Sequence, residues 1–216
     1  MRSIAKGKEP NSLSTHRVST HSDYCNYSDK DVLREALVRD QQGLCCYCMS
    51  RIEAVGEAMK IEHWQCQENY SFRQLDYSNM LGACRGGEGQ PETKQHCDTR
   101  KGQRDLKFNP ADPGHRIDQR ISYHRDGTIT SSDDEFRVQL EDVLNLNLDL
   151  LRNRRKGVID ALADWLREYH RRHHRRPDNS ILQRKRAQWV PSSGSLQAYA
   201  GVAVWWLDQR LARSET

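Results

Sequence analysis

The spacing of four cysteines constrains this chain more than any other feature of its sequence. Cys45 and Cys48 form a C-x2-C pair in the stretch LCCYCMS, and Cys84 and Cys97 follow, each close to Gly-rich or polar turn sequence. Two thiolates from one knuckle and two from further along the chain make a tetrahedral set that suits a structural Zn²⁺ ion. The alternative is four unrelated buried cysteines, and we favour zinc because of the knuckle spacing.

The composition is that of a polar protein. The 216 residues are 36% hydrophobic with a mean hydropathy of −0.94, and no apolar run is long enough, at about 18 residues, to form a transmembrane helix. The first ten residues, MRSIAKGKEP, lack the apolar core of a signal peptide. We therefore expect a cytoplasmic protein without membrane contact, in which seven cysteines do not form a disulfide framework. No role is assigned to Cys25, Cys46 or Cys66.

Positive charge is concentrated in one segment. Residues 152–186 contain twelve Lys or Arg and four Asp or Glu, a net charge of +8, whereas the whole chain carries +4 and the remainder therefore −4. Such a segment indicates either an anionic partner at one end of the protein or a solvated helix face, and charge alone does not separate the two.

Hydrophobic patterning predicts an α+β fold in three parts. Residues 1–30 lack periodicity and are expected to form an arm packed over the rest. A helix follows, capped by Ser28 or Asp29 and ended by Gly43. Two short strands around a Gly56 turn are expected within 45–66, a short helix from Asp98, and a hairpin in RISYHRDGTIT. The expected helices after the hairpin span residues 135–144, 148–173, 178–188 and 195–212.

A second group of residues accompanies the cysteines. Glu62 and His63 are adjacent in MKIEHWQCQ, Asn79 precedes Cys84, and Asp98 follows Cys97. In this order the residues resemble the ββα-metal fold of HNH endonucleases in its zinc-supported form. That pattern has an acid–His pair on the second strand, an Asn in the following loop and a last metal ligand at the start of a short helix. The resemblance covers about residues 44–109 and implies an N-terminal arm over 1–30, an HNH nuclease domain over 31–115, and a hairpin with a helical docking region over 116–216.

The resemblance implies metal-dependent hydrolysis of phosphodiester bonds in DNA or tRNA. His63 has the pKa of a general base near neutral pH, and Glu62 and Asp98 offer the hard oxygen ligands that Mg²⁺ or Mn²⁺ prefers. Neighbouring residues of a strand point to opposite faces, so Glu62 needs a twist or bulge if His63 faces the nucleophile. Asn79 is expected to orient the loop that holds His63, and its alternative is a simple turn residue.

Two further residues follow the last metal ligand. Arg100 and Lys101 are candidates for phosphate binding, with a solvated helix face as the alternative. The chain also departs from the family pattern at two points. Asp98 stands where many HNH proteins have Asn or His, and the spacing between Cys84 and Cys97 is longer than the usual knuckle, so His96 is an alternative metal ligand.

Short stretches suggest a narrower relationship. KGKEP, HCDTRKG, LKFNP and VLNLN resemble the HNH subunit of Septu-type and retron-associated anti-phage systems. This resemblance implies an ABC-type ATPase partner docked through the C-terminal helices and, in retron systems, a reverse transcriptase with its RNA and DNA. The alternative function is a non-catalytic subunit that binds nucleic acid or docks the ATPase.

Overall fold

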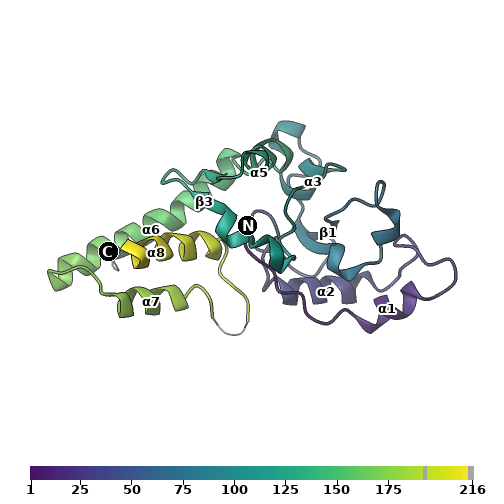
Figure 1. Ribbon diagram of the computed structural model, residues 1–216, viewed down its shortest axis with the longest axis horizontal. Coiled ribbons are helices and arrows are strands. Elements are labelled where there is room, and N and C mark those ends of the chain that lie inside the picture. The colour runs from purple at the N-terminus through teal and green to yellow at the C-terminus, as the bar shows by residue number, and fades with distance from the viewer. Residues whose placement is uncertain (192–193, 214–216) are drawn as a thin grey trace.

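The computed structural model describes residues 1–191 and 194–213 and shows an α+β protein with two small antiparallel sheets. Figure 1 shows an elongated molecule, with α1, α2, α3 and β1 towards one end and α6, α7 and α8 at the other. No helix in the described part of the chain is both long and apolar enough to cross a membrane. The α-helices and strands are α1 Asn11–Arg17, α2 Lys30–Asp40, β1 Met59–His63, β2 Met80–Cys84, α3 Cys97–Lys101, α4 Ile117–Arg120, β3 Ile121–Tyr123, β4 Ile129–Ser131, α5 Asp134–Val138, α6 Asp149–His173, α7 Asn179–Ala187 and α8 Ala200–Arg213.

The long helices lie close to where their patterns predict them. The side chain of Asp178 accepts a hydrogen bond from the amide of Ile181 and caps α7, and Asp133 caps α5 in the same way through the amide of Phe136. α8 begins at Ala200 and not at residue 195, because Tyr199 has a φ of 60° that a right-handed helix excludes.

The first sheet corrects the predicted hairpin within 45–66. β1 pairs with β2, and the cysteine knuckle carries only the isolated bridge between Leu44 and Arg51. The knuckle turns too tightly to form a strand, since Met49 has a left-handed φ of 65° and its amide bonds back to the carbonyl of Cys45. Glu62 and His63 therefore lie on the first strand of the sheet and not on the second.

The N-terminal arm is partly helical. It contains α1, whose Leu13 is fully buried, and the amide of Ile4 bonds to the carbonyl of Pro110. The expected packing over the rest of the protein is present. The sequence did not predict α1, because six of its seven residues are polar and the single buried Leu13 gives no period.

One hydrophobic core runs from the arm to α8 and crosses residue 115. The amide of Cys97 donates to the carbonyl of Leu144, and the amide of Tyr199 donates to the carbonyl of Met49. The helical region is thus attached directly beside the cysteine knuckle and beside the first residue of α3.

The hairpin of β3 and β4 packs on α6 through its turn. The guanidinium of Arg155, which is buried in α6, donates to the carbonyls of Gly127 and Leu146 at 2.6 and 2.7 Å. At the far side of the hairpin, Tyr123 makes an edge contact with Trp205, while the adjacent Trp206 is buried. Trp205 thus reaches the hairpin, and Trp206 belongs to the core.

Substitutions at two glycines test the packing of this turn separately from helix propensity. Gly127 has a φ of 84°, and an added Cβ would lie 2.1 Å from the carbonyl oxygen of Arg152. We expect Gly127→Ala to lower the free energy of unfolding by about 2 kcal/mol or more. Gly157 lies within α6 with open space around its Cα, so Gly157→Ala should raise the free energy of unfolding by about 0.5–1 kcal/mol. Urea denaturation of both variants tests this, and equal stabilities would contradict the close approach of the turn to α6.

Candidate metal centre and active-site cleft

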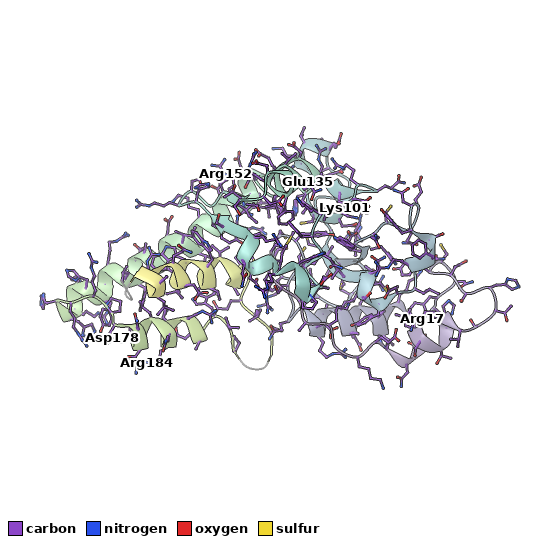
Figure 2. The ribbon with its side chains drawn as sticks, viewed as in Figure 1. Arg17, Lys101, Glu135, Arg152, Asp178 and Arg184 are labelled. Atoms are coloured by element: carbon purple, nitrogen blue, oxygen red, sulfur yellow. The ribbon has the colours of Figure 1, made fainter. Side chains whose placement is uncertain are left out.

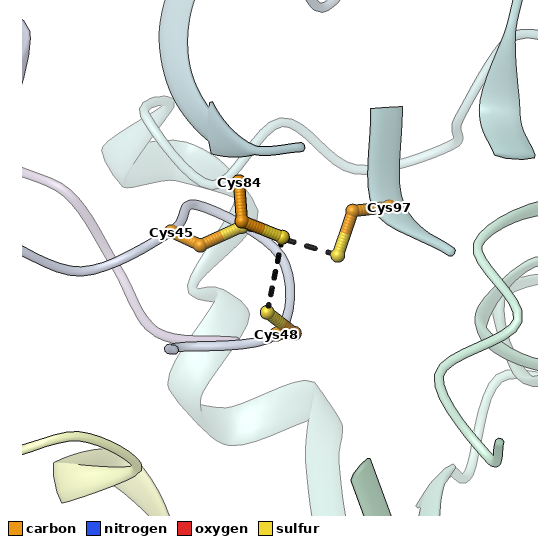
Figure 3. A group of neighbouring side chains, drawn as sticks. All are labelled: Cys45, Cys48, Cys84 and Cys97. Carbon is orange, nitrogen blue, oxygen red and sulfur yellow. Dashed lines mark hydrogen bonds between the residues drawn. The ribbon is translucent and has the colours of Figure 1, made fainter. Parts of the chain in front are cut away.

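Four cysteines converge on one point in the structure, as Figure 3 shows. Cys45 and Cys48 come from the knuckle, Cys84 ends β2 and Cys97 begins α3; all four sulfur atoms lie within 4.8 Å of one another. The sulfurs of Cys45 and Cys97 are 3.9 Å apart, and those of Cys48 and Cys84 are 3.7 Å apart. A tetrahedron with Zn–S bonds of about 2.3 Å has edges of about 3.8 Å. The cluster is therefore compatible with zinc binding.

The structure also bears on the choice between Cys97 and His96. The sulfur of Cys97 belongs to the cluster, while Nδ1 of His96 contacts that sulfur at 3.1 Å and the sulfur of Cys84 at 4.0 Å. Cys97 has a left-handed φ of 56°, an uncommon conformation for a residue with a side chain, and its amide is held by the carbonyl of Leu144. The fourth sulfur of the cluster is thus that of Cys97, with His96 beside it.

The four thiols affect one another's protonation. Burial first, and then contact with the other thiols, raises the pKa of Cys97 well above its usual range. A metal ion bound at this point would displace those protons, since zinc takes cysteine as the thiolate. Cys25 is exposed, and Cys46 and Cys66 are buried outside the cluster.

A cleft of about 420 Å³ runs along β1 on another part of the same unit. Glu62, His63 and Asp98 all line it. The cleft thus brings together two residues from β1 and one from α3. A twist or a bulge was expected for Glu62; the pairing of β1 with β2 is continuous through Glu62 and His63, so there is no bulge. Both side chains reach the cleft at the end of the strand without it.

Hydrogen bonds fix the tautomer of His63. Its Nε2 lies 2.9 Å from the carbonyl oxygen of Gln74, and because a carbonyl only accepts, Nε2 carries the proton. Nδ1 is then the acceptor, and the amide nitrogen of Gln67 donates to it at 3.1 Å. Burial lowers the pKa of His63 below its usual value near 6.5, against the opposing effects of Gln74 and Asp98. The imidazole is thus neutral at pH 7 with a basic nitrogen directed at a side chain on the cleft wall.

Glu62 is held more tightly than an ordinary strand carboxylate. Its Oε1 accepts from the hydroxyl of Tyr47 at 2.7 Å and lies 3.0 Å from Nζ of Lys101, and only 3% of the residue is exposed. Burial and a hydrogen bond with Asp98 raise the pKa of Glu62 well above its usual range, while the Lys101 charge acts in the opposite direction. The two carboxyl groups of Glu62 and Asp98 are therefore neighbours.

Asn79 is fully buried and joins the two ends of the loop between β1 and β2. Its Oδ1 accepts from the amide of Gln65, and its Nδ2 donates to the carbonyls of Gln65 and Arg73. Arg73 precedes Gln74, the residue that binds His63, so the amide of Asn79 holds the backbone on which the His63 tautomer depends.

The two predicted phosphate ligands have different surroundings. Lys101 is 1% exposed and also donates to the carbonyl of His63, so a solvated helix face is excluded for it, and Figure 2 shows it among other side chains. Arg100 forms an ion pair with Glu92. Neither residue lines the cleft that contains Glu62.

Sequence reasoning missed three cations that do line the cleft: Arg34, Lys60 and Arg85. Nζ of Lys60 lies 3.5 Å from Oδ2 of Asp98 and 3.0 Å from Oε1 of Glu88. Lys60 precedes Glu62 by two positions, and the period of two in a strand was a signal that could have placed both on one face. The other two carry no such signal, because they come from α2 and from the residue after β2.

No protein-family model matches this chain, and no curated protein matches it either.

The cysteine cluster predicts one tightly held zinc ion per chain. Elemental analysis of freshly purified protein should find it, and Cys48→Ser or Cys84→Ser should remove it and lower the melting temperature, because each takes away one thiolate ligand. Cys25→Ser is the matched control, since this exposed thiol lies outside the cluster and its loss should leave both readings unchanged. Wild-type protein that is folded and free of zinc would contradict the prediction.

Proposed function

We propose that this chain is a metal-dependent endonuclease of the HNH type that hydrolyses phosphodiester bonds in nucleic acid. The observation that carries the proposal is the meeting of Glu62, His63 and Asp98 in one cleft, with His63 held as the tautomer whose unprotonated Nδ1 accepts a hydrogen bond from Gln67 on the cleft wall. The order strand, strand, helix over β1, β2 and α3 and the four-cysteine cluster beside it support the same assignment.

The residues present fit a divalent cation at Glu62 and Asp98. Carboxylate oxygens are the hard donors that Mg²⁺ or Mn²⁺ prefers, and the two groups are neighbours on the cleft wall. Asp98 is the more accessible, with 18% of its side chain exposed, and it forms an ion pair with Lys60, which also lines the cleft. A cation held there would supply Lewis-acid stabilisation of the charge that develops on the phosphate and on the leaving oxygen. The thiolate cluster is the softer and more enclosed set, which suits a structural zinc ion.

The chain's own residues account for the proton transfer. A water molecule that replaces the Gln67 amide at Nδ1 of His63 gives up a proton to that nitrogen as its oxygen attacks phosphorus. The bond from phosphorus to the sugar oxygen breaks, and this oxygen takes a proton from solvent. The carbonyl of Gln74 accepts from Nε2 throughout and stabilises the imidazolium that forms. Lys101 is a positioning residue, since it holds Glu62 and the carbonyl of His63 without reaching the cleft.

The alternative is a non-catalytic subunit that binds nucleic acid or docks an ATPase. Such a subunit has no use for a buried His with a fixed tautomer beside two carboxyl groups, and this arrangement favours catalysis. Membership of an anti-phage complex and docking of an ABC-type ATPase through α6, α7 and α8 stay predictions from the resemblance.

His63→Ala should reduce cleavage of plasmid DNA or total tRNA by about 10²–10⁴-fold, since this is the contribution of a positioned general base. Zinc content and melting temperature should stay close to those of the wild type. His124→Ala changes an exposed histidine of the β3–β4 turn and serves as the control. A His63→Ala variant with wild-type cleavage of the same substrate would refute the assignment.

Asp98→Asn should raise the Mg²⁺ or Mn²⁺ concentration needed for cleavage at least about tenfold, because one anionic oxygen donor is lost. Titration calorimetry with Mn²⁺ should show the same weakening without any substrate. Asp105→Asn removes an equal charge from an exposed residue outside the cleft and should change neither value. Full cleavage by the wild type with no added divalent ion would contradict the role of this site.

A further inference from the structure

We propose that the cavity at the far end of the helical region is a second phosphate-binding site, which holds the backbone of the same nucleic acid that enters the cleft. This inference rests on the proposed function and deepens it, because it makes the substrate an extended nucleic acid. A substrate confined to the cleft would have no contact with this end of the molecule.

The cavity has a volume of about 600 Å³ and lies where α6, α7 and α8 meet. Leu182 and Pro177 are buried and contribute apolar lining to the cavity. The polar groups on its walls are all basic among the residues that the structure describes: Arg167, His170, Arg176 and Arg210. Cationic groups from three separate segments around one hollow are the arrangement that binds phosphate oxygens.

Part of this charge has an ordinary structural explanation. The last turn of α6 is rich in basic residues, which stabilise the negative end of a helix dipole. Arg176 lies outside that explanation because it follows the left-handed cap residue His174 and belongs to no helix. It is exposed, and no ion pair joins it to an acidic residue in the described chain, whereas its neighbour Arg175 pairs with Asp178. Arg176 is thus an exposed cation without an ion-pair partner among the described residues.

The occupant we assign is a phosphodiester backbone and not an acidic protein segment. Arg210 lies with its guanidinium over the ring of Trp206, at 3.0 Å from Cζ to the ring centroid, so its planar face is fixed. Arg167 already pairs with Asp164 on its own helix. Residues 152–186 carry a net charge of +8, with their Lys and Arg residues at 152–156 and 167–186, and this charge favours a polyanion such as nucleic acid.

The distance between cavity and cleft sets the length of the substrate. The carbonyl of Leu144 binds the first residue of α3, next to Asp98, and α6 begins five residues later. α6 then runs for 25 residues, and its last two turns line the cavity. Figure 1 accordingly shows the cleft strand β1 and the end of α6 well apart, and Figure 2 shows Asp178 and Arg184 at that far end. At about 1.5 Å per residue the separation is on the order of 30–40 Å, or roughly ten base pairs of duplex.

The test measures binding of fluorescent duplexes to full-length protein by anisotropy, with no added divalent cation and over a series of salt concentrations. Probes of about 8 and about 24 base pairs are compared, since only the longer one reaches both sites. The variant is Arg176→Gln. The matched control is Arg171→Gln, which removes the same charge from an exposed residue of α6 that pairs with Glu168 and does not line the cavity.

For the wild type we expect the long probe to bind at least about tenfold more tightly than the short one, with a steeper dependence of log K on log salt. Arg176→Gln should reduce this gain with length and lower the salt slope by about 0.9, the loss of one phosphate contact. Arg171→Gln should keep most of the gain in affinity with probe length and most of the salt slope. Equal effects of the two substitutions would overturn the inference, as would a wild-type affinity that does not rise with probe length.

The outcome is separable from that of the proposed function. Binding that depends on length and on Arg176, in a protein that cleaves no nucleic acid, would uphold the second site and refute the nuclease. Cleavage that requires His63, with binding indifferent to Arg176, would uphold the nuclease and refute the second site. Loss of ATPase capture in Arg176→Gln with unchanged binding of nucleic acid would assign the cavity to a protein partner and overturn the inference.

Discussion

The meeting of four thiols from three separate segments is the constraint on which the rest of this structure depends. Cys45 and Cys48 turn the chain after α2, Cys84 ends β2, and Cys97 starts α3. The sheet between them has only two strands, which on their own are marginally stable in water. A metal ion bound by the cluster would tie the strands, the knuckle and the short helix together, and the backbone bond from Cys97 to Leu144 extends that tie to the helical region.

Each carboxyl group of the cleft has a lysine partner. Glu62 has the buried Lys101, and Asp98 has Lys60, which also lines the cleft. The first pair is enclosed, so removing either member would leave an uncompensated charge in the interior. The second is partly exposed, and Lys60 has Glu88 as another partner. Burial thus distinguishes the enclosed Glu62–Lys101 pair from the partly exposed Asp98–Lys60 pair.

Local sequence patterns predicted helices and strands, but they did not predict which strand pairs with β1. The knuckle spacing identified Cys45 and Cys48, the turn sequence around Cys84 and Cys97 indicated the other two members of the cluster, and the Asp126-Gly127 turn placed the hairpin of β3 and β4. The partner of β1 was missed because the knuckle sequence also alternates, and only the left-handed Met49 excludes it from a strand. The sequence did not predict the burial of Lys101, because a five-residue helix is too short for its periodicity to show which face is buried.

The order of the cluster residues along the chain has a consequence for biosynthesis. All four cysteines precede residue 98, whereas the helices that pack beside them follow Leu144. During translation the whole thiol set therefore leaves the ribosome while α6 is still being polymerised. A metal ion bound by the nascent chain would precede the later helices, which then assemble beside the knuckle through the carbonyl of Met49 and the amide of Cys97.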